Sequence, residues 1–433
     1  MKKTVLILLT ISIFTLLLLL SSCSMAMKDS ASVGGGYAPG DFAAGAAPEL
    51  DSDVSDDGEV EDGGDSVRLP AGMMTAGAWN DNAFYNDWLE LFLQGENKNG
   101  KFYDYTNPTL SWGYNSHRRV SVSVMNGENP VMGANVTAYD SDGNRLFDAV
   151  TDAQGKAYLF PTANEGTISV TNGKATVFSD FTEEERDISV EISTASNKLN
   201  VIEIMLVVDV TGSMSDELEF LKTELRDVIN RISSNDSDTI IKLAMLFYRD
   251  TDDSVPFDYY DFTDVTTLDG LNVQQAALNS QRASGGGDYP EAVDQALDMA
   301  VNKQWSTGAT TKIIFHVLDA PAHDDNKNKK LLADSVEKAA ELGIRICPII
   351  CSGSASVTEY IMREAAIYTG GTFIFVTDDS GIGNSHHDPE LPNATIELLN
   401  SLMVRLVNGY HTGEFDEPIY WKQDPNLAVK ERN

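Results

Sequence analysis

Continuous apolar runs alternate with amphipathic stretches between residues 200 and 408, and this alternation constrains the fold more than any other feature. The apolar runs lack the polar residue at every second position that marks a half-exposed strand, so each is expected to be a strand buried on both faces. Strands and helices in alternation predict a doubly wound, mostly parallel α/β sheet covered by helices. The expected strands are 201–209, 240–248, 311–319, 344–351 and 372–376, and the expected helices are 214–232, 291–301, 328–342, 356–368 and 394–407.

A period of two residues replaces this pattern between residues 117 and 196. Short runs of alternating apolar and polar residues are separated by turn pairs such as Asn126-Gly127 and Asp142-Gly143. Such spacing predicts a small all-β sandwich that precedes the α/β region. Residues 129–136 and 151–155 are similar to carboxypeptidase-regulatory-like modules, which are commonly spacers on secreted proteins. This segment contains no recognisable set of catalytic groups.

The segments that flank these two regions carry weaker signals. Residues 71–116 are expected to be helical or irregular, with one helix over 77–95 whose apolar face includes Phe84 and Trp88. Residues 409–433 follow the last expected helix and are interpreted as a C-terminal tail.

The first 22 residues have the layout of a secretory signal peptide. Lys2 and Lys3 precede an apolar run over residues 4–20, and small residues follow it. The tetrad Leu20-Ser21-Ser22-Cys23 resembles the bacterial lipobox, which implies that Cys23 is lipidated and becomes the first mature residue. A transmembrane anchor is the alternative, although the apolar run is at the short limit for crossing about 30 Å of hydrocarbon. We expect an extracytoplasmic lipoprotein attached to a bacterial membrane, at the cell surface or the outer membrane.

Residues 23–70 have the composition of a disordered acidic tether. Positions 31–48 are rich in Gly, Ala and Pro, and positions 49–65 hold many carboxylates without any Lys or Arg. Such a segment buries too little apolar surface to offset the entropy lost on ordering. The whole chain has 31 Lys and Arg against 66 Asp and Glu, a net charge of −35. This balance argues against nucleic acid as a partner and against charge-based binding to anionic lipid, so the expected membrane contact is the lipid anchor.

Side chains that carry oxygen gather where the expected strands end. Asp209 ends the first strand, Thr211 and Ser213 follow it, Asp319 ends the third, and Asp288 follows three glycines before an expected helix. Open α/β sheets bind ligands beyond the carboxyl ends of their strands, where the strand order reverses. Carboxylates and hydroxyls without Cys or paired His suit Mg²⁺, Ca²⁺ or Mn²⁺ rather than Zn²⁺.

The run Asp209-Val210-Thr211-Gly212-Ser213 resembles the Asp-x-Ser-x-Ser sequence of von Willebrand factor type A domains. That family has a Rossmann-like fold and binds Mg²⁺ or Mn²⁺ at a metal-ion-dependent adhesion site. The resemblance covers residues 200–408 and implies that Asp209, Thr211 and Ser213 are the ligands from the first loop. Asp319 matches the family's aspartate after the fourth strand, which often acts through water. The family usually has Thr in its second loop, where this chain offers Asp288 instead.

Each of these residues also has a purely structural interpretation. Ser213 can cap the first helix, and Asp288 can cap its own helix with Glu291 three residues later. Asp288 is thus either a direct ligand or a helix cap. Asp209 and Asp319 are costly at the ends of buried strands unless they are paired or bound to a metal. A metal site accounts for all five residues, whereas caps account for two of them.

The resemblance implies a binding or adhesion module and not an enzyme. A surface-tethered type A domain would use its cation to capture an acidic group of a partner protein, and we expect a monomer. The alternative is a Mg²⁺-dependent phosphotransferase, because the first loop also resembles the phosphorylated loop of haloacid-dehalogenase-like enzymes. Against this, Thr211 stands where the soluble phosphatases of that family carry an acid/base Asp. A metal-free structural lipoprotein is the third interpretation.

Two further groups of residues have metal-binding or redox chemistry. His386, His387 and Asp388 lie in a Gly-rich loop and are interpreted as a solvated rim loop. Cys347 and Cys351 lie on one expected strand, where a rise of about 3.3 Å per residue would place them about 13 Å apart. That separation is beyond the reach of a disulfide, so we expect two buried thiols.

Overall fold

The computed structural model describes residues 73–95, 100–287, 289–378, 389, 391 and 394–430, all of them within one compact unit, residues 65–433. The predicted signal peptide, Cys23 and the whole of the predicted tether lie outside the described residues, as do Asp288 and the loop with His386, His387 and Asp388. Among the described residues, no helix combines the length and the apolar character that a bilayer crossing requires.

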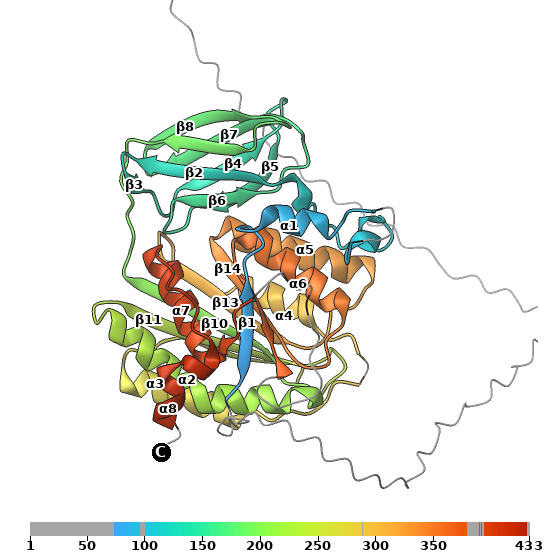
Figure 1. Cartoon of the computed structure of the whole chain (residues 1–433), viewed down its shortest axis with the longest axis vertical. Helices are drawn as coiled ribbons and strands as arrows, with labels where there is room; N and C mark the ends of the chain where they lie inside the picture. Colours follow the sequence, from blue (N-terminus) through green and yellow to red (C-terminus); the bar gives the residue numbers. More distant parts are fainter. Residues whose placement is uncertain are drawn as a thin grey trace, which may run out of the picture. The chain divides into compact units, whose positions relative to one another are not determined.

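An eight-stranded sheet forms the centre of this unit (Figure 1). Its strands are, in spatial order, β12 (Phe257–Asp264), β11 (Ile240–Tyr248), β10 (Val201–Asp209), β13 (Thr311–Leu318), β14 (Ile344–Ile350), β15 (Phe373–Val376), β1 (Thr75–Trp79) and β16 (Glu397–Leu398). The strands from β11 to β15 are parallel, whereas β12 pairs antiparallel with β11, and β1 pairs antiparallel with both β15 and β16. The predicted mostly parallel α/β sheet is confirmed.

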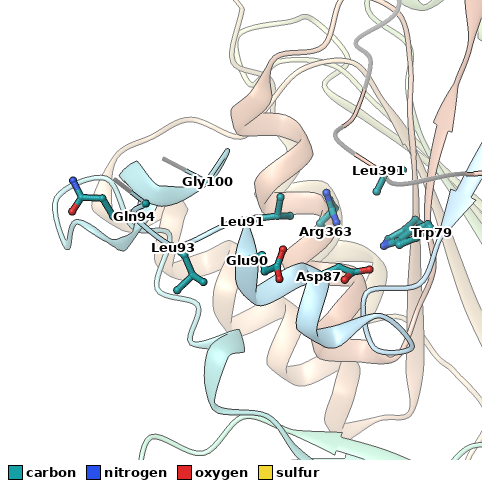
Figure 2. A pocket seen from close by; sticks show the side chains of 10 residues that line it. Trp79, Asp87, Glu90, Leu91, Leu93, Gln94, Gly100, Arg363 and Leu391 are labelled. Atoms are coloured by element: carbon teal, nitrogen blue, oxygen red, sulfur yellow. The ribbon is translucent and has the colours of Figure 1, made fainter. Parts of the chain in front are cut away.

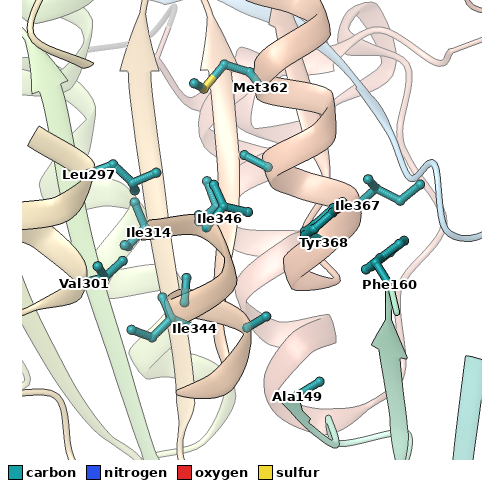
Figure 3. Close-up of a cluster of buried hydrophobic side chains, with 14 of the residues drawn as sticks. Ala149, Phe160, Leu297, Val301, Ile314, Ile344, Ile346, Met362, Ile367 and Tyr368 are labelled. Carbon is teal, nitrogen blue, oxygen red and sulfur yellow. The ribbon is translucent and has the colours of Figure 1, made fainter. Parts of the chain in front are cut away.

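Helices cover both faces of this sheet. On one face lie α2 (Ser215–Asn235), α3 (Leu268–Ser280) and α7 (Leu399–Thr412), and on the other lie α4 (Val293–Val301), α5 (Asn326–Glu341) and α6 (Ser356–Thr369). Successive side chains of β10 enter the two cores in turn, as a strand buried on both faces requires: Leu206 packs with the first group and Val207 with the second. Figure 3 shows the second core, where Leu297 of α4 lies beside Ile314 of β13.

The beginning of the described chain differs from the expected helix over 77–95. Residues Thr75–Trp79 form β1, and the helix is confined to α1 (Tyr85–Glu90). The ring of Phe375 lies so close to Gly77 that a Cβ there would meet it at 2.2 Å, and only glycine allows this approach. Pairing of β1 with two strands of the sheet therefore outweighs the helical periodicity of its sequence.

Between β1 and β10 the chain forms two four-stranded sheets, so this all-β segment is inserted between two strands of the central sheet. One contains β2 (Val120–Asn126), β3 (Asn129–Pro130), β6 (Lys156–Leu159) and β9 (Asp187–Glu191), and the other β4 (Asn135–Tyr139), β5 (Arg145–Val150), β7 (Gly166–Asn172) and β8 (Ala175–Phe181). Val122 and Val170, one from each sheet, share a core. The likeness to carboxypeptidase-regulatory-like modules stays a prediction.

The all-β segment packs directly on the α/β part. Phe160 stacks on Tyr368 of α6 with ring centroids 4.2 Å apart, and the two lie side by side in Figure 3. The guanidinium of Arg345, on β14, approaches the carboxylate of Asp152 at 3.5 Å. The core of the all-β segment and the core beneath α4, α5 and α6 therefore form one continuous apolar cluster.

The chain contains ordered elements that the sequence pattern did not indicate. Strand β12 and helix α3 follow β11. The residues of β12 are mostly half-buried, and Asp and Thr interrupt its aromatic residues, so the strand lacks a continuous apolar run. Helix α7 begins at Leu399 instead of residue 394 because Glu397–Leu398 join the sheet as β16. The expected tail over 409–433 contains the end of α7, a short 3-10 helix and α8 (Pro425–Lys430). Its Trp421 is buried with Met73 and Leu398. The expected pair of buried thiols, Cys347 and Cys351, is confirmed.

A buried ion cluster fastens the N-terminal segment to α6. The guanidinium of Arg363 donates to both carboxylate oxygens of Asp81, at 3.0 and 2.5 Å, and to Glu359 at 3.1 Å. All three side chains are at most 2 % exposed, and Lys101 adds a second cation 2.5 Å from Glu359. The ring of Trp88 lies 5.1 Å from the guanidinium. The charges in this cluster are therefore matched within the protein.

Arg363→Ala is expected to lower the free energy of unfolding by about 3–5 kcal/mol, because it removes the guanidinium that is bound to both buried carboxylate oxygens of Asp81 and that also contacts Glu359. Arg145→Ala is the matched control, since Arg145 also contacts two carboxylates but is 53 % exposed, and exposed pairs contribute at most about 1 kcal/mol. Denaturant unfolding of both variants measures the difference, and equal losses would contradict it.

Candidate metal centre

Strand β10 marks the place where the order of strands reverses. It pairs with β11 on one side and with β13 on the other, and the chain leaves through α2 to β11 before it returns past β10 to β13. Open α/β sheets bind their ligands at the carboxyl ends of the strands at such a point. Asp209 is the last residue of β10, and Asp319 directly follows β13. The two carboxylates thus lie at the position expected of a ligand site.

Four of the five predicted site residues are joined by hydrogen bonds or close contacts. The Oδ1 atom of Asp209 accepts from the backbone N–H of Thr211 at 2.8 Å and from its hydroxyl at 2.7 Å. The hydroxyl oxygens of Thr211 and Ser213 are 3.5 Å apart, and Ser213 forms a side-chain hydrogen bond with Asp319. Asp209, Thr211 and Asp319 are buried, whereas Ser213 is exposed. The site therefore has a buried base and an opening to solvent.

Asp209 carries a buried oxygen, Oδ2, that has no hydrogen-bond donor among the described residues. Burial, followed by the nearby charge of Asp319, raises the pKa of Asp209 to about 7, although the hydrogen bonds from Thr211 act in the opposite direction. Burial also raises the pKa of Asp319. A costly carboxylate pair with a free oxygen beside two hydroxyls is a donor set that a hard divalent cation would stabilise. The residues present thus fit Mg²⁺ or Ca²⁺.

The helix caps that offered a structural interpretation are not formed. Helix α2 begins at Ser215 after a 3-10 turn, and its N-cap residue, Met214, makes no side-chain cap bond. Helix α4 begins at Val293 with Ala292 as N-cap, again without a side-chain cap bond. Because α4 starts five residues after Asp288, capping of this helix does not explain Asp288, and the alternative of a cap with Glu291 is wrong.

The second loop approaches the first through its glycines. Gly285 and Gly286 both have positive φ, 83° and 85°, a conformation that side chains rarely adopt. The carbonyl of Gly285 accepts from the N–H of Gly212 at 3.3 Å, and the N–H of Gly286 donates to Asp253 at 2.9 Å. Asp288 itself lies outside the described residues, so its assignment as a ligand stays a prediction.

Sequence reasoning missed three carboxylates that the fold brings to this site. Asp250 and Asp253 lie in the loop after β11, at the same edge of the sheet as Asp209 at the end of β10, and their place after an expected strand could have revealed them. The imidazole of His323 and the carboxylate of Asp250 are hydrogen-bonded at 2.9 Å. Glu291 is 4 % exposed, and burial, followed by the charges of Asp209 and Asp250, raises its pKa to about 9. Its polar neighbours come from other loops, so no local pattern identifies it.

Within the described residues, no three His, Cys, Asp or Glu side chains are arranged as a ready-made metal cluster. The predicted set does not require such a group, since two of its four described members are hydroxyl residues. A cation held there would rely on Thr211 and Ser213 as much as on the two aspartates.

A separate cavity of about 630 Å³ lies beside α1 (Figure 2). Its lining includes Trp79, Asp87 and Leu91, and Arg363 points into it from α6. The guanidinium of Arg363 is already bound to Asp81 and Glu359. None of the four described site residues, Asp209, Thr211, Ser213 and Asp319, lines this cavity. It therefore offers no chemistry to the candidate metal centre.

Residues 203–377 match the family model of the von Willebrand factor A domain. This segment is similar in sequence to von Willebrand factor A domains. It contains Asp209, Thr211, Ser213 and Asp319, and it covers less than half of the chain. The all-β segment and β1 lie outside the matched residues.

Similarity to individual proteins is distant. An alpha-protein kinase of Dictyostelium discoideum, vwkA, is 26 % identical over 147 residues, which are 34 % of this chain and 22 % of that protein. The chain spans about a fifth of the length of the curated relatives it matches. The activity of those whole proteins is therefore not carried over.

Two solved structures show partial overlap. The conserved hypothetical protein BatB from Bacteroides thetaiotaomicron is 16 % identical, with 42 % of this chain and 91 % of that chain covered and a TM-score of 0.30. The pilus adhesin SpaC from Lactobacillus rhamnosus GG in its open conformation is 10 % identical, with coverage of 68 % and 35 % and a TM-score of 0.35. Overlap at these TM-scores says nothing about function.

Without a cation, the stability of the fold is expected to fall as the pH rises from about 4 towards about 7. The folded protein keeps a proton on Asp209 up to about pH 7, whereas the unfolded chain releases it near 3.8, so the unfolded state binds fewer protons in this window. One such group contributes at most about 1.4 kcal/mol per pH unit.

Asp209→Asn removes this titration and should reduce the pH dependence by the share of one group, while buried carboxyls such as Asp294, whose pKa is raised by burial to about 6, continue to titrate. Thermal melts in chelator at about pH 4 and about pH 7 would measure the change. Glu364→Gln is the comparison variant, because burial raises the pKa of Glu364 to about 8 and this residue lies on α6, remote in sequence from Asp209. If the Asp209→Asn protein keeps the full pH dependence of wild type, Asp209 is not the titrating group.

Proposed function

We propose that the chain is a surface-anchored binding module that captures a partner protein through a divalent cation at Asp209, Thr211, Ser213 and Asp319. The observation that carries the proposal is the buried Oδ2 of Asp209, which lacks a donor among the described residues and lies in a set of carboxylate and hydroxyl oxygens. Von Willebrand factor A domains are generally interaction modules, and residues 203–377 match that family. The opening at Ser213 leaves room for an oxygen of the partner.

In this proposal the four side chains hold Mg²⁺, Ca²⁺ or Mn²⁺ through oxygen atoms. When bound, the cation supplies a positive centre that attracts a carboxylate of the partner. Thr211 keeps the hydroxyl that the Ser of the family motif provides. The hydroxyl of Thr211 also orients Asp209 through their 2.7 Å hydrogen bond. The backbone N–H of Thr211 fixes the same Asp209 oxygen, so its other oxygen is the one left for the metal.

Attachment to the membrane would come from the N-terminus. The lipobox ending at Cys23 supports a lipid anchor, and the acidic residues up to position 70 would separate that anchor from β1. We propose an extracytoplasmic location and a monomeric chain. With a net charge of −35, the protein itself offers little attraction to an anionic lipid surface.

Saturating Ca²⁺ or Mg²⁺ is expected to raise the free energy of unfolding by about 2.7 kcal/mol at 100 times the dissociation constant. Asp209→Ala should abolish this gain, because Asp209 lies at the centre of the oxygen set. Asp334→Ala is the control, since Asp334 is an exposed carboxylate of α5 paired with Lys330. Thermal melts of the full chain in detergent, with chelator and with each cation, measure the effect.

Pull-down from a surface fraction should give a partner that chelator and Asp209→Ala both release and that Asp334→Ala retains. A wild-type chain that melts identically with chelator and with cation would contradict the proposal and favour a metal-free structural role. Mg²⁺-dependent hydrolysis of p-nitrophenyl phosphate, lost in Asp209→Ala, would favour a haloacid-dehalogenase-like phosphotransferase.

Cys23→Ala is expected to release the protein from membranes or to block removal of the signal peptide, because the lipid is attached to that sulfur. Ser22→Ala is a suitable control, as it keeps a small residue beside the cysteine. Membrane fractionation and the mass of the processed chain measure the outcome. A Cys23→Ala protein of mature size that stays on the membrane would show that the anchor lies elsewhere.

A further inference from the structure

A cavity of about 560 Å³ lies where the all-β segment meets the α/β part. Lys156 and Tyr158 of β6 line it from the all-β segment, and Trp79 of β1 lines it from the central sheet. Trp79 is paired with Phe373, the first residue of β15, so the cavity lies at the amino ends of the parallel strands. The candidate metal centre lies at the opposite edge of the sheet, beyond Asp209. The two sites are therefore separate.

Arg119, which directly precedes β2, also lines this cavity. Its Nη1 atom donates to the backbone carbonyl of Asn82 at 2.6 Å and to the side-chain oxygen of the same residue at 3.2 Å. The guanidinium lies 3.8 Å from the ring centroid of Tyr85 and 5.3 Å from that of Tyr158. Burial lowers the pKa of Arg119. Neutral amide and aromatic groups thus hold a partly buried positive charge in a fixed position.

The positive charge in this cavity is not neutralised by the part of the chain that the structure describes. There, neither Arg119 nor Lys156 forms an ion pair, although the chain has 66 acidic residues against 31 Lys and Arg. Arg405 lines the cavity too, but its Nε donates to Glu397 at 2.8 Å. Asp187 is the one carboxylate among the described lining residues, and it is exposed. Two unpaired cations beside one carboxylate leave a single positive charge, which matches a ligand with one negative charge.

Aromatic rings form the apolar wall of the same cavity. Phe84 and Phe415 line it, and they are 48 % and 40 % exposed. Phe84 stacks on Trp79 with ring centroids 4.3 Å apart. The volume of the cavity lies within the range of about 300–1,000 Å³ that is usual for small-molecule sites, and a carboxylate alone would leave most of it empty. The exposed rings therefore favour a ligand with an apolar body.

We propose that this cavity binds a small organic carboxylate with an aromatic or aliphatic body. The planar guanidinium of Arg119 keeps Nε and Nη2 for the carboxylate, because its hydrogen bonds to Asn82 use Nη1 alone. Lys156 supplies a second cation, and the body of the ligand covers Phe84 and Phe415. This is a second binding activity of the chain, and it requires no metal ion.

Calorimetric titration of the full chain in non-ionic detergent and chelator tests the proposal, with 3-phenylpropionate and octanoate as the aromatic and aliphatic probes. At least one of them should bind saturably, and its uncharged amide should bind at least about tenfold more weakly, because it loses the charge-assisted hydrogen bonds. A wild-type chain that binds neither carboxylate would overturn the proposal. Tighter binding of phenyl phosphate, which carries two negative charges, would overturn the assignment to a carboxylate.

Lys156→Gln should lower the affinity about three- to fivefold, and its side chain is exposed, so the fold should be unaffected. Arg118→Gln is the matched control. Arg118 precedes Arg119 in the chain and donates to the carbonyl of Thr162 at 2.6 Å, but it does not line the cavity. This variant loses the same charge and should keep the wild-type affinity. Equal losses in the two variants would overturn the proposal, because they would show a general effect of net charge.

Asp187→Asn should have the opposite effect and raise the affinity about two- to fivefold, because it removes the negative charge that faces the same ligand. Damage to the fold would not produce such a gain. Unchanged affinity in both Asp187→Asn and Lys156→Gln would show that the cavity does not hold the carboxylate, and would overturn the proposal.

The same titration separates this site from the candidate metal centre, which is proposed to attract a carboxylate through its cation. Asp209→Ala should bind the probe as wild type does, in chelator and with Ca²⁺ alike. Binding that requires Ca²⁺ and is lost in Asp209→Ala would overturn the second site while supporting the metal centre. Binding in chelator by a chain that shows no response to Ca²⁺ or Mg²⁺ would support the second site alone.

Discussion

Parallel pairing of β10 between β11 and β13 is the constraint on which the rest of the molecule depends. The register aligns Val208 with Phe247 on one side and with Val317 on the other, and a shift would expose apolar residues on both faces. Because the three strands end together, the polar residues that follow them are brought to one edge of the sheet. Asp209 and Asp319 become neighbours through this alignment, although 110 positions separate them in the sequence.

Two groups of buried carboxylates in this protein differ in whether the chain itself supplies a positive charge beside them. Beside α6, Asp81 and Glu359 are neutralised by the guanidinium of Arg363, so that group is complete within the chain. At the carboxyl edge, Asp209 and Glu291 keep buried oxygens without a donor among the described residues. The first group thus has its counter-charges within the chain, whereas the second presents free carboxylate oxygens of the kind that a hard divalent cation would stabilise.

The sequence predicts those elements whose buried residues form a recognisable pattern over a few consecutive positions. The strands 201–209 and 311–319 were predicted because residues buried on both faces form continuous apolar runs. Strand β12 is half-buried and its aromatic residues are interrupted by Asp and Thr, and β1 is stabilised by partners far along the chain, so neither leaves a local pattern. The candidate ligands of the first loop lie within five consecutive positions and were recognised by resemblance, whereas Glu291 acquires its neighbours only through the fold.

The position of β1 determines how the chain would carry load. Because β1 runs antiparallel to β15, its first residue, Thr75, lies at the same edge of the sheet as the carboxyl ends of the parallel strands. The all-β segment, inserted after β1, stands outside the path from Thr75 to Ser213. Force between an N-terminal attachment and a partner at Ser213 would enter and leave at this one edge, so it would run across the strands from β1 to β10. Such a force acts along the hydrogen bonds between neighbouring strands and would open them one after another from the carboxyl edge, which makes the pairing of β1 with β15 the first to be loaded.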